Sequence, residues 1–487
     1  MTSTGVAGGD ARDRYQNPLV ERYASEEMAA LFSARRRVGG WRRIWIALAE
    51  AQAELGLGGV TAEQVATLER AADDIDFDRA AVLEGELRHD VMAHVRTFGE
   101  VAPEAAAILH LGATSAFVVD NGDLLVMRDA TRVVERKCLC VVQALAGFAD
   151  RWADLPTLGW THFQPAQPTT VGKRACLWIA DLLLDLDEIA FRLREFRLRG
   201  LKGTTGTQAS FLALAGGDGA KVDELERRVV AKLGASAAFP VTGQTHSRKV
   251  DAAWAATLAG VAESTGKFSH DMRLLQHLGE VLEPFGARQV GSSAMPYKRN
   301  PMRAERMSAL SRFAIQTAGN LAYTAGSQWL ERSLDDSAVR RIALPELFLV
   351  VDALLVLYHG VASGLEVREA RVARNLMREL PAMATETLLM AATESGGDRQ
   401  ELHERIRVRA RETAAGIEGG EGSDLLDRLA GEPGFAELPD ETWRRARDPA
   451  MYVGRAPEQT RRFLEQEVRP RLAAYDGPLE MTGDVRV

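Results

Sequence analysis

The chain has 487 residues, of which 46% are hydrophobic and 26% charged, a balance typical of a protein with a large buried core. Its formal net charge of −8 argues against an overall basic field for nucleic acid or an anionic membrane, so an anionic ligand would need a local cluster of Arg and Lys. The three cysteines, Cys138, Cys140 and Cys176, lack C-x-x-C spacing and cannot all pair, which argues against a zinc site or a disulfide framework and favours the cytoplasm.

The first 113 residues predict an N-terminal domain of short helices. The opening stretch has no apolar run, so we expect no signal peptide. Within the domain, LRHDVMAHV carries His89 and His94, which lie about 140° apart on a helix. Zinc sites of the H-E-x-x-H type need i, i+4 spacing on one face, so metal binding is disfavoured and a capped helix with surface histidines is the alternative.

Residues 114–366 predict a central domain built as a bundle of long helices. The clearest helix has apolar residues at alternating gaps of four and three from Ala175 to Phe196, and Gly200 is expected to end it. A 3.5-residue repeat of this length predicts nearly parallel neighbours. The other segments with a helical period are 122–148, 250–283, 302–328 and 342–364.

The most apolar run, residues 347–360, is interrupted by Asp352 and is shorter than the ~20 residues that span a bilayer, so we predict a buried helix. Residues 367–487 are rich in Arg and Glu and predict a C-terminal domain of short helices. Alternating strand patterns are almost absent. The sequence therefore predicts an all-α fold of three domains.

Polar, Gly-containing segments flank the long helices, and such segments often carry function. HLGATS offers Thr114 and Ser115, either as a helix cap or as ligand-binding hydroxyls. THFQPAQPTT places His162 on a turn at the head of the heptad helix, where it could transfer protons or be structural. KGTTGTQASF (202–211) and TGQTHSRK, with Gln244, are ambiguous in isolation.

The stretch GSSAMPYKRNP (291–301) combines a helix start with positive charge. Asn300 is expected to cap a helix whose first residue is Pro301. Lys298 and Arg306, with the arginines between them, and the helix N-terminus would attract an anion. Farther along, LERSLDDSAVRR contributes more arginines that can bind phosphate or carboxylate.

These segments together resemble one superfamily. GSSAMPYKRNP is similar to the fumarase/aspartase signature G-S-S-x-M-P-x-K-x-N-P, and the segments RYAS, LRHDVMAHVRTFG, HLGATS, THFQPAQPTTVGKR, KGTTGTQASF, TGQT and LDDSAVRR resemble the adenylosuccinate lyase family, most closely its animal-type branch. The resemblance runs from about residue 15 to residue 470. It implies a homotetramer whose central bundle contains helices of all subunits, with each active site shared between three chains.

The resemblance also implies an activity and its residues. The reaction is reversible β-elimination of fumarate from adenylosuccinate, giving AMP, and from succinyl-aminoimidazole-carboxamide ribotide in purine biosynthesis, without a metal or organic cofactor. Ser292 would be the general base and His162 the general acid. Substrate contacts map to Arg22, Tyr23, Arg88, His89, Asp90, Thr114, Ser115, Gln244, Lys298, Asn300, Arg306, Arg332, Ser337 and Arg341. Gly122, His246 and Val339 depart from the family pattern.

The chemistry fits these residue types. Elimination needs a base, an acid and stabilisation of a dianionic intermediate, and a serine base must be activated by its surroundings. We expect the 291–301 loop to close over the substrate and exclude water. One alternative is a superfamily lyase that acts on another succinylated amine or nucleoside analogue in a specialised pathway. Another is a non-catalytic helical scaffold, against which the presence of Ser292, His162 and Lys298 together argues.

Overall fold

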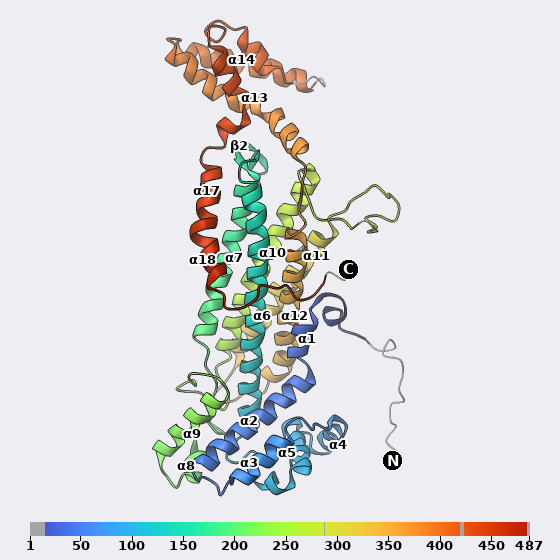
Figure 1. Ribbon diagram of the computed structural model, residues 1–487, viewed down its shortest axis with the longest axis vertical. Coiled ribbons are helices and arrows are strands. Elements are labelled where there is room, and N and C mark those ends of the chain that lie inside the picture. Colours follow the sequence, from blue (N-terminus) through green and yellow to red (C-terminus); the bar gives the residue numbers. More distant parts are fainter. Residues whose placement is uncertain (1–14, 287, 419–422, 485–487) are drawn as a thin grey trace.

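The computed structural model describes residues 15–286, 288–418 and 423–484. It is 68% helical with 4% strand, which confirms the all-α prediction. Five long helices run along the length of an elongated molecule (Figure 1). They are α6 (Ser115–Arg151), α7 (Val171–Arg194), α10 (Lys249–Leu278), α11 (Met302–Ser327) and α12 (Asp336–Ala362).

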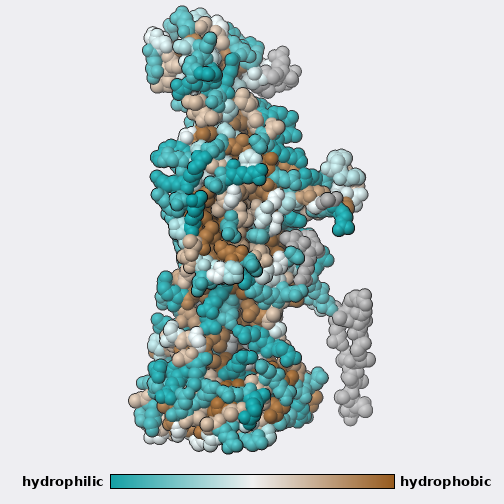
Figure 2. Space-filling model, viewed as in Figure 1, coloured by the Kyte–Doolittle hydropathy of each residue, from teal (hydrophilic) through white to brown (hydrophobic). Residues whose placement is uncertain are grey.

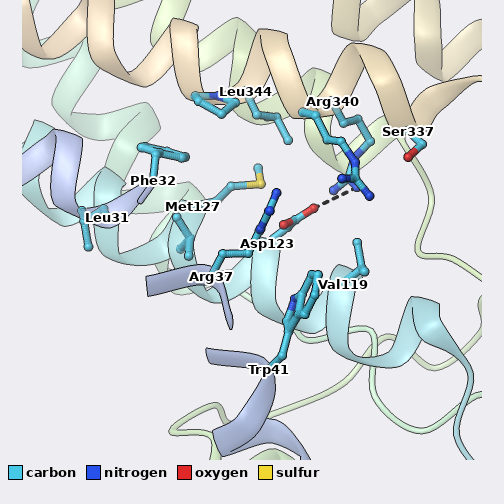
Figure 3. A pocket seen from close by; sticks show the side chains of 13 residues that line it. Leu31, Phe32, Arg37, Trp41, Val119, Asp123, Met127, Ser337, Arg340 and Leu344 are labelled. Carbon is cyan, nitrogen blue, oxygen red and sulfur yellow. Dashed lines mark ion pairs between the residues drawn. The ribbon is translucent and has the colours of Figure 1, made fainter. Parts of the chain in front are cut away.

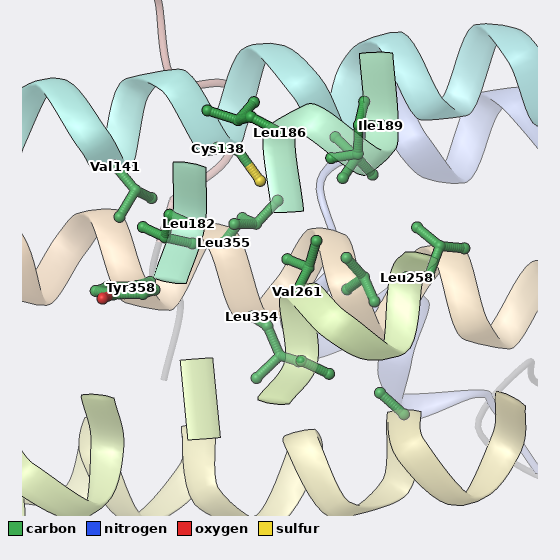
Figure 4. Close-up of a cluster of buried hydrophobic side chains, with 14 of the residues drawn as sticks. Cys138, Val141, Leu182, Leu186, Ile189, Leu258, Val261, Leu354, Leu355 and Tyr358 are labelled. Carbon is green, nitrogen blue, oxygen red and sulfur yellow. The ribbon is translucent and has the colours of Figure 1, made fainter. Parts of the chain in front are cut away.

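The apolar heptad positions of α7 form the buried face of the helix, as the sequence predicts. Its apolar seam is buried against α6 and α10, and Leu182, Leu186 and Ile189 lie among the residues of the bundle core (Figure 4). The predicted end at Gly200 is wrong, because α7 stops at Arg194. Gly200 instead begins the next connection with a φ of 76°, where a Cβ would lie 2.4 Å from a Glu226 carboxylate oxygen.

Helix α12 is buried, as predicted. Its length and hydropathy would suffice for a membrane span, but 78% of the apolar window is buried inside the protein. Its Asp352 is fully buried and accepts hydrogen bonds from Lys137 Nζ of α6 (2.5 Å) and from the Ser25 amide (2.7 Å). Lys137 also donates to Ser25 Oγ (2.9 Å). The one charge in the apolar run therefore ties α6, α12 and the start of α1 (Glu26–Leu31) together.

Removing one partner of this buried pair should destabilise the protein strongly. We expect Lys137→Met to lower the free energy of unfolding by about 3–5 kcal/mol, because Asp352 would be left charged without its cation in the core. The double variant Lys137→Met/Asp352→Leu should lose less. Urea unfolding followed by circular dichroism measures both. A single variant as stable as the double variant would contradict this account of the pair.

The lower end of the molecule is a second helical cluster (Figure 1). Trp45, Phe98 and Phe117 are buried in it, and helices from 209–232 pack there beside those of the N-terminal region. Its elements are α2 (Ala34–Glu54), α3 (Ala62–Arg70), α4 (Phe77–Leu87), α5 (Asp90–Val101), the 3-10 helix η3 (Pro103–Ile108), α8 (Ala209–Leu214) and α9 (Gly219–Lys232).

The C-terminal region forms a third cluster at the upper end and then returns to the bundle (Figure 1). The cluster contains α13 (Glu369–Glu394), α14 (Arg399–Glu418), α15 (Leu425–Ala430), α16 (Asp440–Ala446) and η4 (Pro449–Tyr452). The returning elements are α17 (Ala456–Phe463), η5 (Leu464–Val468) and α18 (Arg469–Ala474). Leu464 and Val468 are buried in the bundle core. The division at 113/114 and 366/367 stays a prediction.

Short strands complete the described fold. Strands β1 (Pro156–Thr161) and β2 (Gln164–Thr170) form an antiparallel hairpin between α6 and α7. Strands β3 (Val281–Leu282) and β4 (Glu366–Val367) pair beside the end of α10 and the start of α13. The sequence reasoning missed the hairpin, which carries His162 at its tip.

Candidate active site

His162 occupies the two-residue turn of the β1–β2 hairpin. His162 and Phe163 have φ angles of 54° and 56°, the left-handed pair typical of a type I′ turn, which suits the twist of the flanking strands. The Phe163 ring packs on Trp160 with centroids 5.6 Å apart. The position ahead of the heptad helix is as predicted, but the turn joins two strands, and Thr170 is the residue that caps α7. The imidazole is exposed at the end of a stiff projection.

Ser292 lies in the segment between β3 and α11, which projects from the flank of the bundle (Figure 1). Its Oγ accepts a hydrogen bond from the Met295 amide (3.1 Å). Gly291 lies so close to the chain that a Cβ there would be 2.2 Å from the Lys298 carbonyl oxygen. The Lys298 side chain is exposed. The loop thus folds on itself with the serine hydroxyl facing a main-chain N–H donor.

The predicted cap of α11 is wrong. The helix begins at Met302, with Pro301 as its N-cap residue, and Asn300 Nδ2 instead donates to the Gly291 carbonyl (2.7 Å). Glu283, from the end of β3, accepts hydrogen bonds from the amides of Arg303 (3.1 Å) and Ala304 (2.9 Å). Burial raises the pKa of this carboxyl, whereas the two amides lower it. The anion at this helix start is therefore the protein's own side chain.

The LRHD segment joins the start of α5 to α12. Arg88 is the C-cap residue of α4 and has a left-handed backbone conformation. His89 Nδ1 accepts a hydrogen bond from the Met92 main-chain N–H (3.3 Å), so His89 does cap a helix. Asp90 pairs with Arg341 Nη2 (2.5 Å). Burial opposes ionisation of Asp90, but Arg341 outweighs it and lowers the pKa. His94 is buried between the rings of Trp41 and Phe77 rather than on the surface, so that part of the surface-histidine alternative is wrong.

Thr114 and Ser115 lie at the start of α6. Thr114 is the N-cap residue by position, yet its hydroxyl makes no capping bond and has no hydrogen-bond partner although the atom is buried. Upstream, His110 Nδ1 accepts from Trp45 Nε1 (2.9 Å), and burial lowers the His110 pKa to about 4. The sequence reasoning missed His110, whose signal was its place in HLGATS.

The two segments that were ambiguous in isolation meet the LERSLDDSAVRR segment in the structure. Gln244 joins the other two segments. Its main-chain N–H donates to the Glu331 carbonyl (2.9 Å), and its side-chain Nε2 donates to the Thr204 carbonyl (3.1 Å). Arg332, next to Glu331, pairs with the buried Asp336 (2.7 Å). A Cβ on Gly206 would be 1.9 Å from the Thr242 carbonyl, so the close approach needs glycine.

A cavity of about 140 Å³ lies between α1, α2, α6 and α12. Ser337 and Arg341 line it together with Trp41, and the Arg340–Asp123 ion pair (3.0 Å) crosses its wall (Figure 3). Elsewhere, the Arg306 guanidinium lies 5.9 Å from the centre of the Tyr23 ring. Tyr23 follows Arg22 in η2 (Leu19–Tyr23), so the first turns of α11 meet the N-terminal segment.

One chain does not gather all the predicted residues. The hairpin with His162 lies toward the upper end of the bundle, whereas α5, which begins at Asp90, lies at the lower end (Figure 1). The structure brings together Asp90 and Arg341, and likewise Tyr23 and Arg306. Within one chain, the predicted site residues therefore lie in separate groups.

Comparison with known proteins decides the family. The Lyase family model matches residues 21–315, and the model described as the adenylosuccinate lyase C-terminus matches residues 381–463. The adenylosuccinate lyase of Saccharomyces cerevisiae is 48% identical over 467 residues, covering 95% of this chain and 96% of the yeast protein. The chain belongs to the adenylosuccinate lyase family.

Other relatives agree with this family. The adenylosuccinate lyase of Schistosoma mansoni is 44% identical and covers 98% of this chain and 100% of its own length. Among solved structures, the 3-carboxy-cis,cis-muconate lactonizing enzyme of Pseudomonas putida is 28% identical, with a TM-score of 0.82 over 94% of this chain and 100% of that one. The chain thus shares its fold with an enzyme that is named for a lactonizing reaction.

Proposed function

We propose that this chain catalyses the reversible β-elimination of fumarate from adenylosuccinate, giving AMP, and from succinyl-aminoimidazole-carboxamide ribotide, as part of purine biosynthesis. The observation that carries the proposal is similarity to adenylosuccinate lyases at 44–48% identity over nearly the whole chain. The enzyme would work in the cytoplasm without a metal or organic cofactor. Its three cysteines are free and buried.

Ser292 is the proposed base. It would take the proton from the carbon next to a substrate carboxylate, as an alkoxide stabilised by its surroundings. The Met295 amide already donates to its oxygen, and a hydrogen bond to the charged form favours that form. The exposed Lys298 would stabilise the negative charge that develops on the carboxylate. The 291–301 loop would bring both groups to the substrate on closing.

His162 is the proposed acid, protonating the nitrogen that leaves. The rigid turn at the hairpin tip fixes the backbone of an otherwise exposed imidazole, so a second surface can meet it in a defined place. The remaining proposed substrate contacts are the charged and hydroxyl groups already placed. Arg22, Tyr23, Arg306, Arg332, Ser337 and Arg341 suit a phosphate and two carboxylates, while Arg88, His89, Asp90, Thr114, Ser115, Gln244 and Asn300 complete the set.

A homotetramer would complete the site. The partial sites on one protomer are far apart, which fits active sites shared between chains. In support, α7 exposes Leu177 (50%), Leu184 (69%) and Phe191 (38%) at intervals of seven residues. An apolar stripe with this period on a long helix is a coiled-coil seam without a partner in the monomer. Hydrophobic side chains also gather along the flank of the bundle (Figure 2).

Placing a charge on this stripe should break the assembly. We expect Leu184→Glu to convert the tetramer to smaller species and to lower activity at least tenfold, because the carboxylate would be buried against a second copy without a cation. Light scattering after size exclusion measures the mass. Val82→Glu, the same change at an exposed position of α4 (54%), is the matched control and should stay tetrameric. If Leu184→Glu stayed tetrameric, the exposed stripe on α7 would not be part of the interface.

A superfamily lyase for another succinylated amine or nucleoside analogue in a specialised pathway is the second candidate. The fold permits it, since a structure with a TM-score of 0.82 is named for a lactonizing reaction. The test is to assay the purified enzyme with both succinylated purine nucleotides, each with and without its phosphate, by the change in ultraviolet absorbance. Preferential cleavage of the phosphorylated substrates supports the proposal. Cleavage only of dephosphorylated or unrelated succinyl compounds would overturn it.

A further inference from the structure

A fully buried ionic cluster lies where α6, α10 and α12 meet. Its core consists of three carboxylates and three bases, each no more than 4% exposed. The members are Asp120, His246, Arg248, Asp251, Asp336 and Arg340. The sequence comparison with the family motif predicted a departure from the family pattern at His246.

His246 sits between two carboxylates. Its Nδ1 is 2.9 Å from Asp120 Oδ2, and its Nε2 is 2.9 Å from Asp251 Oδ1. A neutral ring carries one proton, so one nitrogen would then face a carboxylate oxygen lone pair to lone pair. Both contacts are satisfied only when both nitrogens carry protons. Burial opposes the charge on His246, but Asp120 and Asp251 outweigh it and raise the pKa.

The protons between His246 and the two carboxylates lie on the imidazole and not on Asp120 or Asp251. Asp120 also accepts from the His246 amide (2.8 Å) and from Arg248 Nη2 (3.0 Å), while Asp251 also accepts from Arg340 Nε (2.7 Å). Burial opposes ionisation of both acids, yet their cationic neighbours lower both pKa values. With the ring charged, the core holds three negative and three positive groups. Without that charge, either Asp120 or Asp251 would face an unprotonated ring nitrogen at 2.9 Å, which is costly in the interior.

Other groups around the ring define its setting. Arg248 Nη1 lies 3.3 and 3.2 Å from the two ring nitrogens, and the Phe239 ring stacks with its centroid 6.4 Å away. At the rim, Asp123 pairs with Arg340 (3.0 Å). Arg199 donates a hydrogen bond to the Gln244 carbonyl (2.9 Å), and its positive charge interacts with the carboxylate of Asp120. All three bases of the core lie within ion-pair distance of both Asp120 and Asp251, and the imidazole bridges the two acids at 2.9 Å on each side.

The cluster reaches two proposed substrate residues. Gln244 is two residues before His246, whose amide and ring are both fixed by Asp120. Asp336 accepts from Arg248 Nε (2.6 Å) with one oxygen and from Arg332 Nη1 (2.7 Å) with the other. The carboxylates that His246 bridges hold Arg248 and Arg340 in place, and Arg248 in turn orients the acid that holds Arg332.

We infer that His246 is a positioning residue for substrate binding. As an imidazolium between Asp120 and Asp251, it fixes the segment that carries Gln244 and, through Arg248 and Asp336, the direction of the Arg332 guanidinium. It does not touch the substrate. This inference rests on the proposed function, because it takes Gln244 and Arg332 as substrate contacts. Its signature is therefore a change in KM rather than in the chemical step.

The kinetic test uses His246→Gln and His246→Lys in the full-length enzyme with adenylosuccinate. Glutamine can donate to only one carboxylate and carries no charge, so KM should rise about tenfold or more, with kcat within about threefold of wild type. Lysine restores the charge and should recover part of the KM change. Asp185→Asn, which weakens the half-buried hydrogen bond that Ser264 Oγ donates to Asp185 Oδ2 (2.6 Å) in the bundle, is the control for lost stability and should leave KM unchanged.

A merely structural role for His246 would lower the active fraction, and so apparent kcat, at constant KM. That result, or an unchanged KM in soluble His246→Gln, would overturn the inference. Neutron diffraction of the wild-type enzyme gives a readout independent of activity. Deuterons on both ring nitrogens near neutral pH are expected, and a deuteron on one nitrogen only would overturn it. A wild-type enzyme inactive on both succinylated nucleotides would instead contradict the proposed function.

Discussion

Ser292→Ala is expected to lower kcat on adenylosuccinate by about 10³-fold, within the 10²–10⁴ range typical of a general base. The alanine has no oxygen to accept the proton, and the Met295 amide would lose the partner that it now has 3.1 Å away. The loop should keep most of its shape, because the bond from Asn300 Nδ2 to the Gly291 carbonyl does not involve the hydroxyl. Steady-state kinetics with the purified variant measures the loss.

The neighbouring serine provides the matched control for this variant. Ser293 is exposed and lies in the same loop, so Ser293→Ala removes an identical group without touching the proposed base. Its activity should stay within about twofold of wild type, consistent with the small effects of most surface substitutions. Calorimetry should show that Ser292→Ala still binds AMP. Near-normal turnover in Ser292→Ala would remove the serine from the role of base.

The bundle could be predicted from the sequence because its signal is local and repeated. The heptad residues of α7 identify the buried face from spacing alone, and the structure buries that face. The hairpin before α7 could not be predicted in the same way. Pro165 and Pro168 interrupt β2, and the turn uses His162 and Phe163 in place of the usual Asn-Gly signal.

The sequence also did not predict which partners the charged and capping groups would have. Asn300 looked like the cap of α11, but the donors are satisfied by Glu283, which lies 20 residues before Arg303 in the chain. Likewise Asp120 and Arg248 meet across 128 residues. Spacing rules see only neighbours on one element, so ion pairs between distant segments have no local signature. The motifs identified which residues matter, and the fold alone showed which of them face each other.

Mixing two inactive variants should restore activity if each active site takes His162 and Ser292 from different chains. We expect His162→Ala alone to lose kcat by about 10²–10⁴-fold, with little change in tetramer stability because the side chain is exposed at a hairpin tip. Ser292→Ala alone should also be nearly inactive. Each variant provides the residue that the other lacks, so a hybrid tetramer can contain sites in which both groups are intact.

The size of the recovery follows from counting chains. In an equal random mixture, half of the chains keep His162 and half keep Ser292, so about a quarter of sites drawn from two different chains would hold both. Activity should therefore rise from near zero to about 25% of wild type after subunit exchange, measured under conditions in which native mass spectrometry shows hybrid tetramers.

The double variant defines what the recovery means. His162→Ala/Ser292→Ala chains exchanged with Ser292→Ala chains contain no intact Ser292 and should stay inactive, which separates complementation from refolding of damaged protein. If each site instead used both residues of one chain, hybrids of the two single variants would contain no intact site. Hybrid tetramers without regained activity would then place His162 and Ser292 of one protomer in the same site.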